Sequence, residues 1–186
     1  FYQESPVDPR VLAVRHLTDE TPVAAAFAAD AVWTVSADGT IVRRMRDARF
    51  TPLQRYPKAA PDCAGLAFDG LYLWTLDAHS RTLSKRLLDA DLTTVSRYRV
   101  PGLKPAALVW DGSALWTLDA GDRVLRRHDL SNPALVVAVL PLPEYADGAY
   151  VPDGLAWDGA RFWTVAERRD GKGPAQLTRH RDEGAR

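Results

Sequence analysis

Short apolar segments separated by tight turns run along most of the chain and predict an all-β protein. The clearest case is residues 65–78, where GLAFDG and LYLWTLDA are two apolar runs joined at an Asp-Gly pair. Asp-Gly between apolar runs is the strongest short-range hairpin signal. Two more segments follow, TLSKRL and TTVSRYRV, and both faces of all these segments are largely apolar. We therefore expect four short antiparallel strands in succession, with no room for helices between them.

The same arrangement recurs along the chain. A Trp-Thr pair occurs four times, and successive copies are 41, 42 and 47 residues apart. The tryptophans of these pairs are Trp33, Trp74, Trp116 and Trp163. Six positions earlier stands an aromatic residue in every copy: Phe27, Phe68, Trp110 and Trp157. Asp-Gly follows this aromatic residue in three copies, whereas the first copy has Ala28-Ala29-Asp30. A proline opens each copy, at Pro22, Pro61, Pro105 and Pro152. All six tryptophans thus fall on two repeat positions, which indicates a repeat protein.

Four antiparallel strands in a repeat of about 40–45 residues are typical of a β-propeller blade. Small residues in the first strand, as in VAAAFAA and CAGLA, suit an innermost strand where several sheets converge on an axis. An unrepeated β-sandwich is the alternative, but it gives no reason for every tryptophan to be in register. The sequence therefore predicts a four-bladed β-propeller in which each blade is a four-stranded antiparallel sheet.

The two ends of the repeat region suggest how the ring closes. The fourth copy stops after its third strand, PAQLTRHR, while an extra segment, VLAVRHL, precedes the first copy. The Arg-His of this segment aligns with the Arg-Tyr of the outer strands LQRYP and VSRYR. Closure by this segment would remove an exposed sheet edge. We expect a lead-in at 1–10 and one domain at 11–186, with blades at 22–57, 61–100, 105–142 and 152–182 plus 11–17.

The repeat LAWDGxxxWT, followed by a strand with a basic residue, resembles the glutamine cyclotransferase-like and quinoprotein amine dehydrogenase-like propellers. The resemblance covers residues 11–182 and concerns the repeat alone. Four-blade closure is also similar to hemopexin-like domains, but the disulfide between first and last blades there has no counterpart, because Cys63 is the only cysteine. No active-site motif of these families can be placed on the chain, so the resemblance assigns no catalytic residue.

Two insertions predict a binding surface on the face that carries the loops between blades. Five extra residues fall in PEYADGAYVPD and five more after Trp163, and both insertions belong to neighbouring blades. Loops on a rigid scaffold often carry function. The predicted contact residues are Tyr145, Asp147, Tyr150, Asp153, Glu167, Arg168 and Arg169. The alternative is that these loops are tolerated surface insertions.

Other polar residues recur near the predicted channel mouth, namely Asp62, Asp77, His79 and Asp119. A ring of carboxylates could hold Ca²⁺, which takes six to eight oxygen ligands. Equivalent aspartates in repeats more often cap turns by accepting backbone N–H groups, so we predict no cofactor and keep Ca²⁺ as an alternative. Basic residues after the third-strand apolar position (Arg44, Lys85, Arg127 and Arg179) are expected to pack over aromatic rings or pair with acids. Cys63, among small apolar residues, is expected to be an inert buried thiol.

The charge and composition of the chain narrow the range of functions that it could have. Lys plus Arg and Asp plus Glu number 24 each, so the chain lacks the basic excess of a nucleic-acid-binding protein. It begins FYQESP without Met; we expect an extracytoplasmic protein whose signal peptide or membrane anchor precedes Phe1, although an arbitrary boundary explains the start equally well. We predict a non-enzymatic module that presents these loops to a protein partner. The alternatives are a propeller that binds a small ligand or metal in its channel, and a cyclotransferase- or hydrolase-like enzyme.

Overall fold

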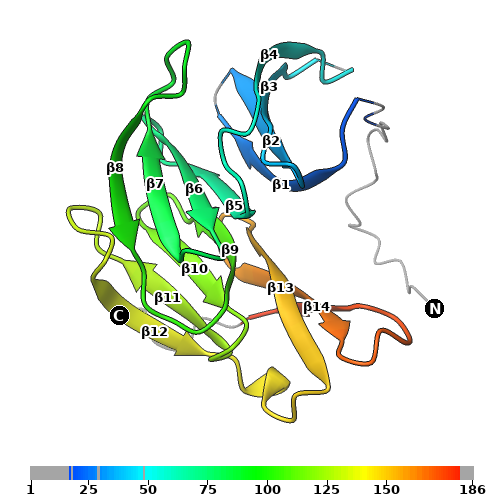
Figure 1. Ribbon diagram of the computed structural model, residues 1–186. Coiled ribbons are helices and arrows are strands. Elements are labelled where there is room, and N and C mark those ends of the chain that lie inside the picture. The colour runs from blue at the N-terminus through cyan, green and yellow to red at the C-terminus, as the bar shows by residue number, and fades with distance from the viewer. Residues whose placement is uncertain (1–16, 18, 29, 48, 181–186) are drawn as a thin grey trace.

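The four Trp-Thr repeats form four antiparallel sheets, which the computed structural model arranges as the blades of a β-propeller (Figure 1). The predicted all-β, four-bladed fold is therefore confirmed. The structure describes residues 17–180 apart from residues 18, 29 and 48. In Figure 1 the sheets follow one another in chain order around a common centre, from blade 1 at the top to blade 4 at the lower right.

The strands of each blade are hydrogen-bonded in sequence order from the inside outward. Blade 1 contains β1 (Pro22–Phe27), β2 (Ala31–Ser36), β3 (Ile41–Met45) and β4 (Pro52–Tyr56). Blade 2 contains β5 (Cys63–Phe68), β6 (Leu73–Asp77), β7 (Thr82–Arg86) and β8 (Thr94–Arg99). Blade 3 contains β9 (Pro105–Trp110), β10 (Leu115–Asp119), β11 (Val124–His128) and β12 (Val136–Pro141). Within the described residues, blade 4 contains β13 (Tyr150–Trp157), β14 (Phe162–Arg168) and β15 (Gln176–Arg179), after the 3-10 turn η1 (Pro143–Tyr145).

The innermost strands converge as the small residues of their sequences predict. Strand β5 lies between β1 and β9, and β9 contacts β13 in turn. A Cβ atom on Gly65 of β5 would lie 2.6 Å from the backbone nitrogen of Leu108 on β9. No side chain fits at that distance, so the glycine permits the close approach of two blades.

Every blade contains the same bulge between its first and second strands. The residue just before the bulge pairs with the residue three positions after the repeat tryptophan. These pairs are Pro22 with Ser36, Cys63 with Asp77, Pro105 with Asp119, and Pro152 with Ala166. In blade 2 the proline at the start of the repeat, Pro61, therefore lies two residues before the position that proline occupies in the other blades.

Each blade packs the tryptophan side of its sheet against the threonine side of the next. Trp33 of blade 1 lies in one core cluster with Leu66 and Leu73 of blade 2. The ring of Trp116 in blade 3 lies 4.8 Å from that of Phe162 in blade 4. Alternation along a strand places Trp and Thr on opposite faces, so a Trp-Thr pair supplies one residue to each of two successive interfaces.

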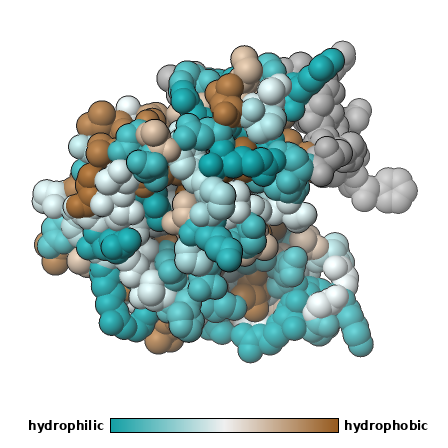
Figure 2. Space-filling model, turned by 45° about the horizontal axis from the view of Figure 1, so that its top comes forward, coloured by the Kyte–Doolittle hydropathy of each residue, from teal (hydrophilic) through white to brown (hydrophobic). Residues whose placement is uncertain are grey.

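Outer strands have no further blade beyond them, and their outward side chains remain in solvent. Val137 and Val139 of β12 are 54% and 53% exposed. Figure 2 shows a largely polar face, with apolar patches gathered on the left, where β8 and β12 lie in Figure 1. Among the described residues, no helix is long and apolar enough to cross a membrane.

Ring closure by the segment at 11–17 concerns residues that, except for Leu17, lie outside the described part of the chain. Strand β15 is the last described strand of blade 4. Pairing of the N-terminal segment with β15 therefore stays a prediction.

The aspartate of the Asp-Gly turn anchors the tryptophan of its own blade. The carboxylates of Asp69, Asp111 and Asp158 each accept a hydrogen bond of 2.7 Å from the indole Nε1 of their tryptophan. In blade 1 the equivalent residue is Ala28, and Nε1 of Trp33 is buried without a hydrogen-bond partner. The irregular first repeat thus leaves an unsatisfied donor in the core.

We expect Ala28→Asp to stabilise the protein, because the new carboxylate would accept the Trp33 indole N–H. Asp69 also accepts the backbone N–H groups of Leu71 and Tyr72, so its charge is well solvated by donors. A net gain of about 1 kcal/mol is typical of one intramolecular hydrogen bond. Thermal unfolding would show it as a rise of roughly 2–4 °C. Asp111→Ala, the reverse change in blade 3, should lower the melting temperature; a destabilised Ala28→Asp protein would contradict the prediction.

Candidate anion-binding site

Each blade holds one buried or half-buried basic side chain against the threonine of its Trp-Thr pair. These basic residues lie within one residue of the end of the third strand: Arg44, Arg86, His128 and His180. Their side-chain nitrogens lie 3.2, 3.3, 2.8 and 2.8 Å from the hydroxyls of Thr34, Thr75, Thr117 and Thr164, respectively. Burial lowers the pKa of both histidines, whereas arginine keeps its charge at neutral pH. The two arginines therefore need a counter-charge.

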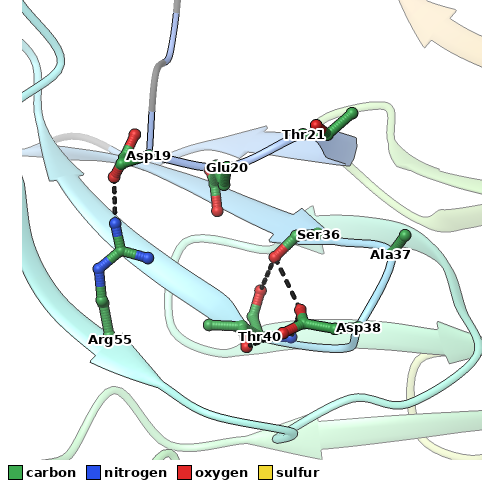
Figure 3. Close-up of a pocket in the computed structure, with 8 residues that line it drawn as sticks. All are labelled: Asp19, Glu20, Thr21, Ser36, Ala37, Asp38, Thr40 and Arg55. Carbon is green, nitrogen blue, oxygen red and sulfur yellow. Dashed lines mark hydrogen bonds and ion pairs between the residues drawn. The ribbon is translucent and has the colours of Figure 1, made fainter.

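Arg44 has two carboxylates as counter-charges. Its Nη2 atom lies 2.8 Å from Oε1 of Glu20 and 2.9 Å from Oδ2 of Asp19. The Glu20 carboxylate also accepts a hydrogen bond from the Thr34 hydroxyl. Figure 3 shows the segment that carries Asp19 and Glu20 above the sheet, with Asp19 joined to Arg55. Burial alone would lower the pKa of Arg44, but the hydrogen bonds to these carboxylates outweigh burial and raise it.

Arg86 is the corresponding residue of blade 2 and has no carboxylate partner among the described residues. It is 8% exposed, and its guanidinium donates to the carbonyl oxygens of Ala59 (2.6 Å) and Leu92 (3.4 Å) and to Thr75 Oγ1 (3.3 Å). All three acceptors are neutral. Burial lowers the pKa of Arg86 from its ordinary value, and the positive charge of Arg97 lowers it further. A buried cation without a counter-ion is costly, which makes this position a candidate anion site.

The shared bulge register explains the missing carboxylates. Glu20 and Asp19 stand two and three residues before Pro22, the residue that begins blade 1. Counting back equally from Cys63, which occupies the same register position in blade 2, gives Pro61 and Ala60. Neither side chain carries charge, so blade 2 has the arginine at this position without the two carboxylates that accompany it in blade 1.

A hollow of about 370 Å³ lies beside Arg86, and we refer to it as the Arg86 hollow. Its polar lining includes two arginines, four hydroxyl side chains and one carboxylate: Arg86, Arg97, Thr75, Ser80, Thr82, Ser84 and Asp77. The carboxylate of Asp77 accepts the backbone N–H of Ser80 at 2.7 Å. The hollow thus presents hydrogen-bond donors and positive charge to a bound group.

A second hollow of about 530 Å³ adjoins it at the outer edge of blades 1 and 2, and we call it the rim hollow. It is also lined by Arg86 and Arg97, and Arg55 contributes from β4. Asp91 is its acidic lining residue. Arg86 and Arg97 thus line both hollows.

The predicted contact residues of blades 3 and 4 do not all reach the surface. Tyr145 is fully buried, and its hydroxyl lies 2.6 Å from Oγ1 of Thr164. Its prediction as a surface contact residue is therefore wrong: η1 turns the side chain into the core between blades 3 and 4. Tyr150 is half-buried, with the Arg168 guanidinium 5.9 Å from its ring centroid.

The remaining predicted contact residues are exposed and charged: Asp147, Asp153, Glu167, Arg168 and Arg169. Arg168 forms an ion pair of 2.8 Å with Asp170, which lowers the pKa of Asp170 to about 2. Although Asp153 is exposed, neighbouring protein atoms partly desolvate its carboxyl group, and this desolvation and the charge of Glu167 raise its pKa. A role of these residues in binding stays a prediction.

The channel-mouth candidates take different positions. Asp62 and His79 are exposed, whereas Asp77 caps its turn. Asp119 is fully buried and accepts backbone N–H groups from Lys104, Gly121 and Asp122. In the described part of the chain, no three Asp, Glu, His or Cys side chains come together as a metal site. Ca²⁺ binding stays an untested alternative.

The sequence reasoning missed Arg86 because it counted two positions on from an apolar residue of each third strand and took Val42 as the counterpart of Leu83. Strand register pairs Trp33 with Arg43 but Trp74 with Lys85, so the turn after β2 is one residue shorter than its counterpart in blade 2. Counting therefore aligned Arg44 with Lys85, although Arg44 corresponds to Arg86. Lys85 and Arg179 lie over tryptophan rings, at 5.5 and 5.6 Å from the centroids.

Comparisons with known proteins give the fold alone. No protein-family model matches the chain, and no curated protein matches its sequence. Among solved structures, the glutaminyl cyclase of Myxococcus xanthus superposes with a TM-score of 0.62 at 14% identity, over 84% of this chain and 69% of the cyclase. An inactive virginiamycin B lyase from Staphylococcus aureus, with quinupristin, gives 0.54 at 17% identity, over 76% of this chain and 47% of the lyase. The WD40 repeats of RRP9 give 0.56 at 13% identity, over 87% of this chain and 49% of theirs. The chain thus spans about half the length of the last two. The predicted likeness to cyclotransferase-type propellers is confirmed at the level of the fold.

Proposed function

We propose that this propeller is a non-enzymatic binding module whose ligand presents a carboxylate or phosphate group to Arg86. One observation carries the proposal: Arg86 is buried beside a hollow and, among the described residues, has no acidic partners like those of its counterpart Arg44. An anion in the hollow would supply the missing counter-charge and could accept hydrogen bonds from Ser84 and Thr75. Charge-assisted hydrogen bonds of this kind are about twice as strong as neutral ones.

The chemistry of the hollow favours binding over catalysis. Cys63 lines the hollow, but burial raises the pKa of its thiol to about 11. The thiol is therefore protonated at neutral pH, and the thiolate is the nucleophilic form. Arginine retains its proton and does not act as a base. The proposed site differs from the loops of blades 3 and 4, for which binding to a protein partner stays a separate prediction, as does an extracytoplasmic location.

We expect phosphate or acetate to stabilise the protein against heat when each replaces chloride at constant ionic strength. A ligand that binds only the native state at 100 times its Kd adds about 2.7 kcal/mol. For a domain of this size the melting temperature would rise by roughly 5–10 °C. Thermal unfolding followed by tryptophan fluorescence would measure it.

Arg86→Gln should abolish this anion-dependent rise. Arg127→Gln is the matched control, because it removes the same charge from blade 3 and should leave the rise unchanged. An equal rise in wild-type and Arg86→Gln proteins would show that anions act elsewhere, and no rise in the wild type would refute the proposed function.

A further inference from the structure

We infer that the group bound at Arg86 is a carboxylate of an acidic polypeptide segment, and that this segment lies across the Arg86 hollow and the rim hollow. The inference rests on the proposed function, and it commits to one class of partner: a protein that presents Asp or Glu side chains in an extended stretch.

The first argument is the example that blade 1 itself provides. There the threonine and arginine of the repeat bind the carboxylate of Glu20, and Arg44 also binds that of the adjacent Asp19. Blade 2 retains the same pair as Thr75 and Arg86, 3.3 Å apart. The repeat therefore already recognises consecutive acidic residues of a polypeptide, and in blade 2 no described residue of this chain supplies them, which favours a segment of another chain.

The second argument is the extent of the positive surface. The Arg86 hollow and the rim hollow have volumes of about 370 and 530 Å³ and share Arg86, Arg97 and Ala59. A free phosphate ion would occupy a small part of this space. Arg97 is exposed on β8 and forms no ion pair with a described residue, so its charge is available to a second carboxylate.

The third argument is charge balance. Arg55, at the far side of the rim hollow, is partly neutralised by Asp19. Two acids also line the site: Asp77 in the Arg86 hollow and Asp91 in the rim hollow. Asp77 is engaged with the backbone of Ser80. Neither Arg86 nor Arg97 forms an ion pair with these acids or with another described residue, so an acidic segment would be positioned at these two arginines.

The test is fluorescence anisotropy with a short, end-blocked, labelled peptide of alternating Glu and Ser, compared with the same peptide in which Gln replaces Glu. We expect the Glu peptide to bind and the Gln peptide to bind at least tenfold more weakly. Arg86→Gln should weaken binding of the Glu peptide about tenfold or more, as expected for loss of a desolvated charge pair. Binding should also weaken as salt rises.

Two variants keep the result interpretable. Arg97→Gln changes an exposed side chain that lines both hollows, so it tests the inference even if Arg86→Gln fails to fold. It should weaken binding of the Glu peptide severalfold. Arg127→Gln should bind as the wild type does. If the Glu peptide binds the wild type, Arg86→Gln and Arg97→Gln equally well, the inference is overturned.

Small anions separate this inference from the proposed function. If phosphate or acetate stabilises the wild type through Arg86 but the Glu peptide does not bind, the polypeptide ligand is wrong and the anion site stands. If neither the peptide nor the small anions act through Arg86, both proposals fail. Competition of phosphate with the bound peptide would place both ligands at the same arginine.

Discussion

Glu20→Ala is expected to cost the protein about 3 kcal/mol of unfolding free energy, because it removes a buried partner of a buried arginine. The side chains of Arg44 and Glu20 are 1% and 2% exposed. Removal of one partner from such a pair typically costs about 3–5 kcal/mol, since the other charge stays buried without compensation. Asp19 remains within 2.9 Å of Arg44, which places the expected loss at the lower end.

Urea or thermal unfolding would measure the loss, which corresponds to a fall of roughly 6–12 °C in melting temperature. Glu167→Ala, which removes an exposed glutamate of blade 4, is the control and should change stability by less than about 0.5 kcal/mol. A loss below about 1 kcal/mol in Glu20→Ala would mean that the buried Arg44 does not depend on Glu20. A missing carboxylate beside Arg86 would then no longer argue for an anion site.

Glu20→Ala also leaves Arg44 without the glutamate carboxylate that Arg86 lacks in blade 2. The atoms that Glu20→Ala deletes correspond to an acetate ion, so acetate should restore part of the lost stability. The rise in melting temperature with acetate should exceed that of the wild type, in which Arg86, but not Arg44, lacks a carboxylate partner among the described residues. Equal responses would indicate that an empty carboxylate position beside a repeat arginine does not bind anions.

The architecture could be predicted from the sequence because its signals are local and repeated. Each Trp-Thr pair identifies a second strand, and in three of the four repeats an Asp-Gly pair, at Asp69, Asp111 or Asp158, identifies the turn before it. Gly65 illustrates why small residues mark the innermost strand, since β9 passes too close for any side chain. Four repetitions of one weak pattern make an assignment that no single copy would support.

The candidate site could not be predicted in this way, because it depends on a difference between repeats. To find the site, one must know that Arg86 is the structural counterpart of Arg44. The turn after the second strand is one residue shorter in blade 1 than in blade 2, so counting along the sequence does not align these two arginines. It also needs the positions of Glu20 and Pro61 relative to a bulge that only strand pairing reveals. Tyr145 was misplaced for a related reason: an inserted loop indicates surface, but one aromatic residue in it folds back into the core.

Asp119→Ala is expected to destabilise the protein by about 3–4 kcal/mol, whereas the equivalent change in blade 2 should cost about 1 kcal/mol. Asp119 is fully buried, and Oδ1 accepts the backbone N–H groups of Gly121 at 3.0 Å and Asp122 at 2.8 Å. Its Oδ2 atom lies 3.2 Å both from the backbone nitrogen of Lys104 and from Nη1 of Arg126. Each buried donor left unpaired costs about 1–3 kcal/mol, and water entering the vacated space would recover part of the sum.

Asp77→Ala is the matched control for Asp119→Ala, because the two residues occupy the same repeat position and, among the described residues, the Asp77 carboxylate accepts a single N–H, that of Ser80. We expect it to lose about 1 kcal/mol. Melting temperatures measured with and without Ca²⁺ separate turn capping from metal binding. If Asp119 only caps its loop, Ca²⁺ leaves the melting temperatures of the wild type and both variants unchanged, and the large loss persists in its absence. If Ca²⁺ stabilises the wild type and this effect disappears in both variants, the aspartates are metal ligands, and the hydrogen bonds that now account for Asp119 would not be its main role.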